Sequence, residues 1–290
     1  MKLKRQLYRS STGIVIAAVS ATLLLTAGCF DYLTEIHDEV MTTQPIIAFT
    51  RTESSYAAIY IINADGSNLK RLTSAGNTYN DDGPSWTPDG AHILFSSNRT
   101  GNYDIYIMDA DGSNQIQLTS NPEEERFPTM SPNSAIIAFA RVQTHFEIYT
   151  MLANGPNLSR LTNNGVSDCY PTWSPDGTQI AFTSGNLADS ELFIMNPYGT
   201  ILARLSNNAV ADWLPPSWSP DGSRLAFTRT VVSYNQIIII NIYGTNERQI
   251  TFTSANNWHP SWSPDGDSIV FSSDRDGGDE EIFIMNSDGS

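Results

Sequence analysis

The residues of this chain best suited to chemistry are carboxylates and ring-bearing side chains that gather ahead of a recurring proline. The carboxylates are Asp81, Asp82, Glu125, Asp168 and Asp212, and the rings beside them are Phe127, Tyr170, Trp213, Trp258 and His259. Carboxylates steer a positively charged molecule toward a surface, and large rings anchor it there. The pattern therefore predicts a surface that binds a cationic peptide or protein. The alternative is that acidic loops only keep an acidic protein soluble, while the rings pack against the fold.

Motifs typical of enzymes are absent from the sequence. It contains no Gly-x-Ser-x-Gly nucleophile, no His-Glu-x-x-His zinc motif and no phosphate-binding glycine loop. The four histidines, His37, His92, His145 and His259, are far apart along the chain. We therefore assign no catalytic residue and expect no cofactor. The sequence favours a binding protein over an enzyme.

One acidic run, residues 274–281, has the composition of a calcium loop. Asp274, Asp276 and Asp279 supply carboxylate oxygens at or near alternating positions, which suits a hard cation. Their spacing does not match the EF-hand pattern, and the corresponding segment Asn98–Asn102 contains no carboxylate. A solvated hairpin is the favoured interpretation, and a weak Ca²⁺ site is the alternative.

All of these residues belong to a unit that the sequence repeats six times. Six phenylalanines mark it, at separations of 46, 44, 43, 45 and 44 residues: Phe49, Phe95, Phe139, Phe182, Phe227 and Phe271. A Pro-x-Trp-Ser-Pro-Asp-Gly phrase such as Pro171–Gly177 precedes five of them. An Ile-Tyr-Ile-Met phrase follows each one, and then come an Asp-Gly or Asn-Gly turn and Arg-Leu-Thr. A period of this length indicates a repeat architecture.

Each phrase of the repeat has a structural interpretation. Short runs of β-branched and aromatic residues bounded by Pro, Asp, Asn and Gly predict strands, and Pro-Asp-Gly predicts a tight turn. Four strands per unit, six times over, predict an all-β, six-bladed β-propeller of four-stranded antiparallel blades over residues 46–290. The tryptophans of the repeat are predicted to be core residues: Trp86, Trp173, Trp218 and Trp262.

Two blades depart from this pattern. The third has Asn133-Ser134 in place of Asp-Gly, and we expect a looser turn there because a serine at positive φ is strained. The sixth stops at Ser290, before its outer strand. Tyr32-Leu33-Thr34 resembles the missing Arg-Leu-Thr phrase, so the last blade is either incomplete or closed by the N-terminal segment. Against closure, Val40 aligns with the tryptophan position of the first repeat, which leaves a short crossing loop.

The N-terminus has the organisation of an export signal. Met1–Arg9 is cationic, and Gly13–Ala27 is an apolar run of 15 residues, shorter than the roughly 20 that span a membrane. Ala27-Gly28-Cys29 resembles a bacterial lipobox. We therefore predict a lipoprotein-type signal peptide over residues 1–28, a lipid on Cys29, and a tether over residues 29–45. The alternatives are ordinary signal cleavage and an uncleaved anchor.

Composition excludes two classes of partner. The formal net charge is −15, which repels phosphate backbones and excludes nucleic acid. Lys70 is the only lysine beyond the leader, so a polybasic membrane contact is excluded and the lipid would be the only membrane attachment. Cys169 is the only cysteine besides Cys29, so no structural disulfide is expected in the exported protein. The oligomeric state is not predicted.

The Trp-Ser-Pro-Asp-Gly phrase and its partners resemble the WD40-like, PD40-type repeats of the TolB-like propeller family over about residues 46–290. The resemblance identifies a fold far better than a function. Phe30, and not Asp, follows Cys29, which resembles lipoproteins of the outer membrane, so we expect a cell-envelope protein on the periplasmic side of that membrane if the cell has two membranes. The acidic and aromatic loops, with no catalytic motif, favour a non-catalytic scaffold that binds a protein or peptide at the mouth of the propeller channel. Similar propellers occur in sugar lyases and beside peptidase domains, so the alternative is a carbohydrate- or peptide-processing enzyme or an enzyme-gating propeller.

Overall fold

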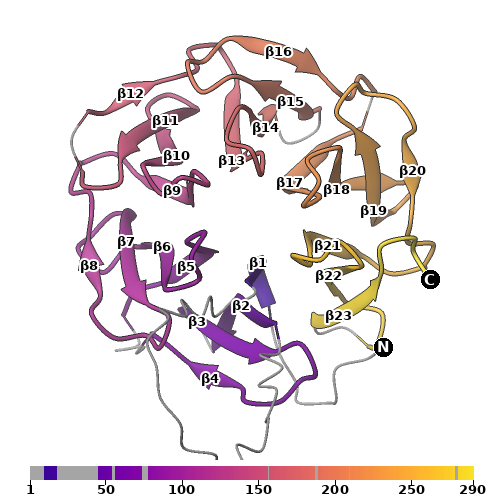
Figure 1. Cartoon of the computed structure of the whole chain (residues 1–290), viewed down its shortest axis with the longest axis horizontal. Coiled ribbons are helices and arrows are strands. Elements are labelled where there is room, and N and C mark those ends of the chain that lie inside the picture. Colours follow the sequence, from indigo (N-terminus) through magenta and orange to yellow (C-terminus); the bar gives the residue numbers. More distant parts are fainter. Residues whose placement is uncertain are drawn as a thin grey trace, which may run out of the picture.

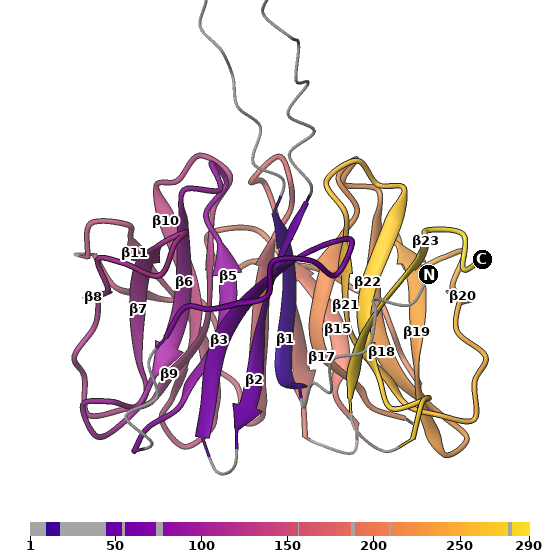
Figure 2. The ribbon, with the colours of Figure 1, turned by 90° about the horizontal axis from the view of Figure 1, so that it is seen from below.

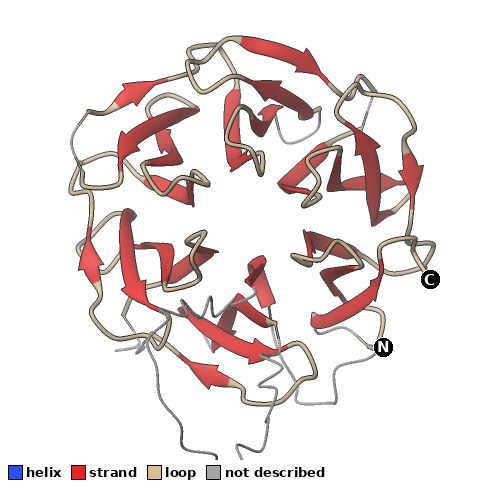
Figure 3. Ribbon diagram, viewed as in Figure 1, coloured by secondary structure: helices blue, strands red, loops and turns tan. Residues whose placement is uncertain are grey.

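The protein is an all-β, six-bladed propeller, as predicted. A computed structural model describes residues 10–17, 45–53, 56–73, 78–155, 157–186, 189–208, 210–277 and 280–290. Six antiparallel sheets stand around a central axis (Figure 1). Every regular element in these ranges is a strand (Figure 3), and none of them contains a helix that could cross a membrane.

The strands occupy equivalent positions in the blades. The innermost strands are β1 (Ser10–Ala17), β5 (Asp81–Trp86), β9 (Glu125–Met130), β13 (Ser167–Trp173), β17 (Asp212–Trp218) and β21 (Asn257–Trp262). The second strands are β2 (Ile46–Glu53), β6 (His92–Ser97), β10 (Ile136–Val142), β14 (Ile180–Gly185), β18 (Arg224–Val231) and β22 (Ser268–Ser273). The third strands are β3 (Tyr56–Asn63), β7 (Asp104–Asp109), β11 (Phe146–Leu152), β15 (Glu191–Met195), β19 (Tyr234–Asn241) and β23 (Glu281–Asn286). The outer strands are β4 (Lys70–Arg71), β8 (Ile116–Gln117), β12 (Ser159–Arg160), β16 (Ile201–Arg204) and β20 (Arg248–Gln249).

The hydrophobic core lies between neighbouring blades. One cluster joins Ala48 and Ile59 of the first blade to Trp86 and Phe95 of the second, and five similar clusters follow around the ring. All four repeat tryptophans are buried, which confirms that they are core residues. Because each sheet buries both of its faces only against its neighbours, the blades stabilise one another.

The turn of the third blade is as tight as those of the other blades, so the expected looser turn is wrong. Ser134 has φ of 57°, close to the 67° of Gly90 in the second blade. Its amide donates to the carbonyl of Ser131 at 2.8 Å, and Gly90 makes the same bond to Thr87 at 2.9 Å. The Asn133 side chain accepts from the Ser131 hydroxyl at 2.7 Å, which holds the turn closed in spite of the strain.

In blades one to five, a threonine or serine that follows the outer strand accepts, through its hydroxyl, a hydrogen bond from a backbone amide of the third strand. In the first blade, Ile59 donates its amide to the Thr73 hydroxyl at 3.0 Å, and its carbonyl accepts from the Leu72 amide at 2.9 Å. Within the described residues the sixth blade has three strands, β21, β22 and β23. Tyr32–Thr34, the segment considered as its fourth strand, lies outside the described residues, so closure by it stays a prediction.

The innermost strand of the first blade comes from the predicted leader. β1 runs antiparallel to β2, with Ile16 opposite Ile47 and Ser10 opposite Arg51. Figure 2 shows the two strands side by side. The repeat pattern of residues 46–290 does not predict this pairing. Cys29 and the rest of residues 18–44 lie outside the described residues.

Candidate functional site

The predicted acidic ring is not an exposed surface. Asp81, Glu125 and Asp212 begin the inner strands of their blades and are at most 1% exposed. Each is paired with an arginine of the second strand or the hairpin that follows it: Arg99 at 2.7 Å, Arg141, and Arg229 at 3.0 Å. A buried carboxylate needs such a partner because burial removes its hydration. The expectation of an exposed carboxylate ring is therefore wrong for these three residues, which form ion pairs inside their blades.

Asp168 is the exception among these carboxylates. It is fully buried and lies opposite Ser184, where the third and fifth blades have Arg141 and Arg229. The Asn164 amide donates to its Oδ2 at 2.7 Å, and its Oδ1 has no hydrogen-bond partner. Desolvation raises the pKa of this carboxyl. The fourth blade thus buries the acid of the repeat without the guanidinium that compensates it elsewhere.

The central channel is shaped by one unusual backbone position in each of five inner strands, β5, β9, β13, β17 and β21. The residue before the repeat proline, or one place earlier in the fifth blade, has positive φ: Gly83 at 61°, Phe127 at 58°, Tyr170 at 55°, Leu214 at 76° and His259 at 53°. The strand pairing shifts register at these bulges. A non-glycine residue held there costs about 1–3 kcal/mol, and a bulge redirects its side chain. The proline that follows the bulge is tolerated because it cannot donate a backbone hydrogen bond and the strand pairing is interrupted there.

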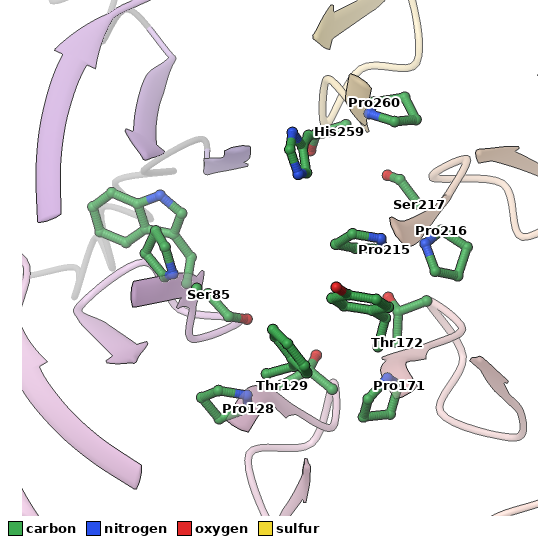
Figure 4. Close-up of a pocket in the computed structure, with 16 residues that line it drawn as sticks. Ser85, Pro128, Thr129, Pro171, Thr172, Pro215, Pro216, Ser217, His259 and Pro260 are labelled. Carbon is green, nitrogen blue, oxygen red and sulfur yellow. The ribbon is translucent and has the colours of Figure 1, made fainter. Parts of the chain in front are cut away.

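These bulges line a pocket of about 240 Å³ in the channel. Its walls are largely apolar and come from five inner strands, β5, β9, β13, β17 and β21 (Figure 4). They comprise Trp86, Phe127, Tyr170, His259 and the prolines Pro84, Pro128, Pro171, Pro215, Pro216 and Pro260. A hydroxyl follows the proline in each of these five strands, at Ser85, Thr129, Thr172, Ser217 and Ser261. The rings of Phe127 and Tyr170 lie 4.2 Å apart, centroid to centroid, across the boundary between blades.

His259 supplies a neutral imidazole to this pocket. Its Nδ1 lies 3.2 Å from the Ser272 hydroxyl, and its Nε2 has no hydrogen-bond partner. Burial lowers the pKa of His259 to about 4, so the ring is uncharged at neutral pH. Among the residues that line the pocket there is no carboxylate, lysine or arginine.

The structure divides the predicted site residues into two groups. Phe127, Tyr170 and His259 are brought together in the pocket, whereas the carboxylates described above are not. Asp82 and Trp258 are half-buried outside the pocket lining, and the Thr50 hydroxyl donates to Asp82 at 3.2 Å. The structure does not describe the side chain of Trp213, although the backbone of Trp213 pairs with Thr228.

The acidic hairpin of the sixth blade is described only in part. Asp274 accepts hydrogen bonds from the backbone and side-chain nitrogens of Asn256 at 2.7 and 2.9 Å. Asp279 lies outside the described residues, so the weak calcium site stays a prediction. In the part of the chain that the structure covers, no three His, Cys, Asp or Glu side chains form a group that could hold a metal ion.

Sequence reasoning missed the prolines and hydroxyls of the pocket. It treated the Pro-x-Trp phrase as a signal for strands and turns, although the same phrase supplies the lining. The available signal was the repetition of Pro-Ser or Pro-Thr at the inner position of five blades, because inner strands of a propeller face the channel.

Comparisons with known proteins point to one family. The family model described as the TolB beta propeller domain matches residues 43–147 and 205–290, more than half of the chain. No curated protein matches the sequence. TolB from Acinetobacter baumannii is 25% identical with a TM-score of 0.67, over 80% of this chain and 58% of that one, so this chain spans less than two thirds of its length.

Two further solved structures share the fold. A putative TolB from Agrobacterium tumefaciens is 23% identical with a TM-score of 0.70, over 80% of this chain and 86% of that one. An oligogalacturonate lyase from Vibrio parahaemolyticus is 13% identical with a TM-score of 0.58, over 82% of this chain and 74% of that one. At these identities the likeness shows the fold alone.

Replacing Ser184 with arginine should complete the missing ion pair of the fourth blade. The new guanidinium would lie opposite Asp168, as Arg229 lies opposite Asp212. We expect the melting temperature at pH 7 to rise by about 2–4 °C, the shift that roughly 1 kcal/mol produces in a domain of this size. In an Asp168→Asn background the gain should disappear. An equal gain in both backgrounds, measured by thermal unfolding, would show that the arginine acts without the carboxylate.

His259 should make the protein less stable in mild acid. The unfolded imidazole takes up a proton below about pH 6.5, while the buried one resists protonation down to about pH 4. Stability is therefore complete above pH 6.5 and is lost as the pH falls, by about 2 kcal/mol at pH 5. His259→Asn, which tolerates the left-handed backbone, should reduce the fall in melting temperature between pH 7 and pH 5. An unchanged fall would assign the acid sensitivity to other groups.

Proposed function

Because this chain belongs to the TolB β-propeller family, we propose that it is a non-catalytic protein of the cell envelope that binds a segment of a protein partner in its channel pocket. The observation that carries this proposal is the pocket itself. Five blades each hold a bulge of positive φ, four of them at a non-glycine residue, and the inner strands around these bulges present apolar rings, prolines and hydroxyls toward one space. Backbone strain repeated at one site is a feature of binding sites, where it fixes side chains in advance.

The lining favours an apolar contact at the centre of the site. Phe127, Tyr170 and the prolines offer rigid apolar surface, which is the usual composition of an energetically dominant anchor site. The hydroxyls and the neutral His259 ring could make a few hydrogen bonds to the bound segment. Charge would act at longer range, since the net charge of −15 attracts a cationic partner and raises its rate of association. We therefore propose a peptide segment or protein of positive charge that inserts an apolar side chain.

Export and lipid anchoring complete the proposed function. The cationic start, the apolar run Gly13–Ala27 and the Ala-Gly-Cys sequence support cleavage before Cys29 and lipid attachment to its thiol. The chain would then be held on the envelope membrane, at the periplasmic side of the outer membrane where there are two. The lipid would be its only membrane contact.

Removing the Tyr170 ring should weaken partner binding without unfolding the blade. Tyr170→Gly is the suitable variant because glycine accepts the φ of 55° at this position, as Gly83 does in the second blade. If the ring is an anchor, affinity for a partner identified by crosslinking in cells should fall by about 2 kcal/mol, roughly thirtyfold. Tyr198→Ala, which removes a ring that is 89% exposed on the outer turn of the same blade, is the control and should leave affinity unchanged. Equal affinities of both variants would contradict a channel site.

Replacing Cys29 with serine should prevent lipid attachment. We expect the variant to appear in the soluble fraction or to accumulate unprocessed, whereas the parent protein stays with the membranes. Cys169→Ser is the matched control because it removes the other thiol of the chain and should not change fractionation. Fractionation followed by mass spectrometry of the N-terminus measures both effects. A parent protein whose Cys29 carries no lipid would contradict the anchor.

A further inference from the structure

Two tyrosines lie on the outer turns of the fourth and fifth blades, at a place where other blades have an acid. Tyr198 and Tyr243 are 89% and 80% exposed. Each precedes the glycine of the turn that follows the third strand. The first, second and sixth blades have aspartate at this place: Asp65, Asp111 and Asp288. Large exposed rings are therefore specific to one side of the propeller.

The turns themselves do not need these rings. In the blades with aspartate, its carboxylate accepts a hydrogen bond from the backbone amide two residues further on. In the fourth blade the Oδ1 atom of Asn196 takes this role and accepts from the amides of Tyr198 and Thr200, at 3.0 Å each. Asn241 does the same in the fifth blade. The tyrosine side chains therefore add exposed apolar surface without closing the turn.

The outer strand between the two turns exposes two further apolar side chains. β16 has four residues, whereas the other outer strands have two. Ala203 lies opposite Ile194. The next pair is Ile201 with Met195, so Leu202 is the extra residue of a bulge. The bulge interrupts the alternation of side chains, and Ile201 and Leu202 are 49% and 51% exposed. Because a bulged edge resists the addition of another strand, a partner would contact the side chains of β16.

These four side chains lie along one side of the ring, and we call them the outer band: Tyr198, Ile201, Leu202 and Tyr243. The turn of the fifth blade packs against the end of β16, since a Cβ atom added to Gly244 would lie 3.0 Å from the carbonyl oxygen of Leu205. Figure 1 shows β16 on the circumference of the propeller, far from the central channel. The outer band is therefore separate from the channel pocket.

The outer band is nearly free of charge in an acidic protein. Arg204 is the only charged residue between Glu191 and Asp212, and it donates to Glu191 at 3.0 Å. No charged residue lies between Arg229 and Glu247. A cationic partner would find no carboxylate to attract it here. A second copy of this chain, which also carries a net charge of −15, can approach closely only at a surface that keeps the carboxylates of the two copies apart.

We propose that the outer band is the contact surface of a dimer of this chain. A two-fold axis at the bulge of β16 sets the two bands antiparallel. The aliphatic side chains of the two copies then meet at the axis, and Tyr198 of each copy packs near Tyr243 of the other. The proposal does not rest on the proposed channel function, and the contact leaves the channel open.

The size of the outer band predicts a weak dimer. At roughly 200 Å² for each tyrosine and about half as much for each half-exposed aliphatic side chain, the band offers about 600 Å² per copy. Two copies would bury about 1,200 Å², which is the lower end of the range for specific interfaces. We therefore expect a dissociation constant of about 10–100 μM.

Sedimentation equilibrium of the full-length chain in a density-matched non-ionic detergent tests the dimer. Tyr198→Asp combined with Tyr243→Asp should raise the dissociation constant at least a hundredfold. Aspartate is the residue that three other blades have at this turn, so the variant should keep its fold. Phe252→Asn is the matched control, because it removes a ring that is 77% exposed outside the band and the fourth blade has Asn207 at the same place. A parent chain that stays monomeric at about 1 mM, or equal effects of the two variants, overturns the proposal.

Salt separates this contact from binding of a cationic partner. Raising the salt concentration from about 50 to 300 mM screens the repulsion between two acidic copies, so the dissociation constant of the dimer should fall. A dissociation constant that rises over this range would show attraction between opposite charges and would overturn the proposal.

A cysteine near the two-fold axis locates the contact. In a Cys169→Ser background, Leu202→Cys should give a disulfide-linked dimer under mild oxidation, because the two thiols face each other across the axis. Ile116→Cys is the control, since Ile116 lies on the outer strand of the second blade and is 57% exposed. Non-reducing electrophoresis measures both. Equal amounts of linked dimer from the two variants would place the contact elsewhere and overturn the proposal.

Discussion

The packing of each blade against its two neighbours is the interaction on which the whole structure depends. Six hydrophobic clusters each combine residues of two adjacent blades, and the last joins Val270 and Ile282 of the sixth blade to Phe49 of the first. A propeller blade on its own would leave both apolar faces in water. The ring must therefore close completely, and every blade needs an inner strand to finish its wall. The first blade meets this requirement with β1, which pairs with β2.

Closure of the ring also explains why the acidic residues are inside. The inner end of each blade is covered by its neighbours and by the crossing loop, so a carboxylate at this position must be compensated within the blade. Arg99, Arg141 and Arg229 provide this compensation, and Asp168 is the one buried case among these acids without it. In the proposed function, the net negative charge would attract a cationic partner at a distance, while the contact in the channel would be apolar.

The channel pocket, on which the proposed function rests, is lined by residues of the repeat itself. Proline breaks the hydrogen-bond ladder at the same place in successive blades, and the bulge beside it directs a side chain inward. Because this side chain is not needed for the blade core, it differs between blades: glycine at Gly83, rings at Phe127 and Tyr170, an imidazole at His259. A regular scaffold thus carries an irregular lining, which is the arrangement that a specific binding site requires.

The fold could be predicted from the sequence, because the spacing of Phe49 to Phe271 and the proline and glycine turns are local signals that repeat. The sequence also determined the burial of the tryptophans and the resemblance to the TolB-like family. The accessibility of the polar residues, by contrast, could not be predicted from the sequence, because it depends on how the blades pack. The repeat position of Asp81 lies two places before that of Tyr170, yet Asp81 is buried against an arginine and Tyr170 lines the channel pocket. That difference arises from the bulge and from contacts between blades more than 40 residues apart in sequence, and neither is visible along a single strand.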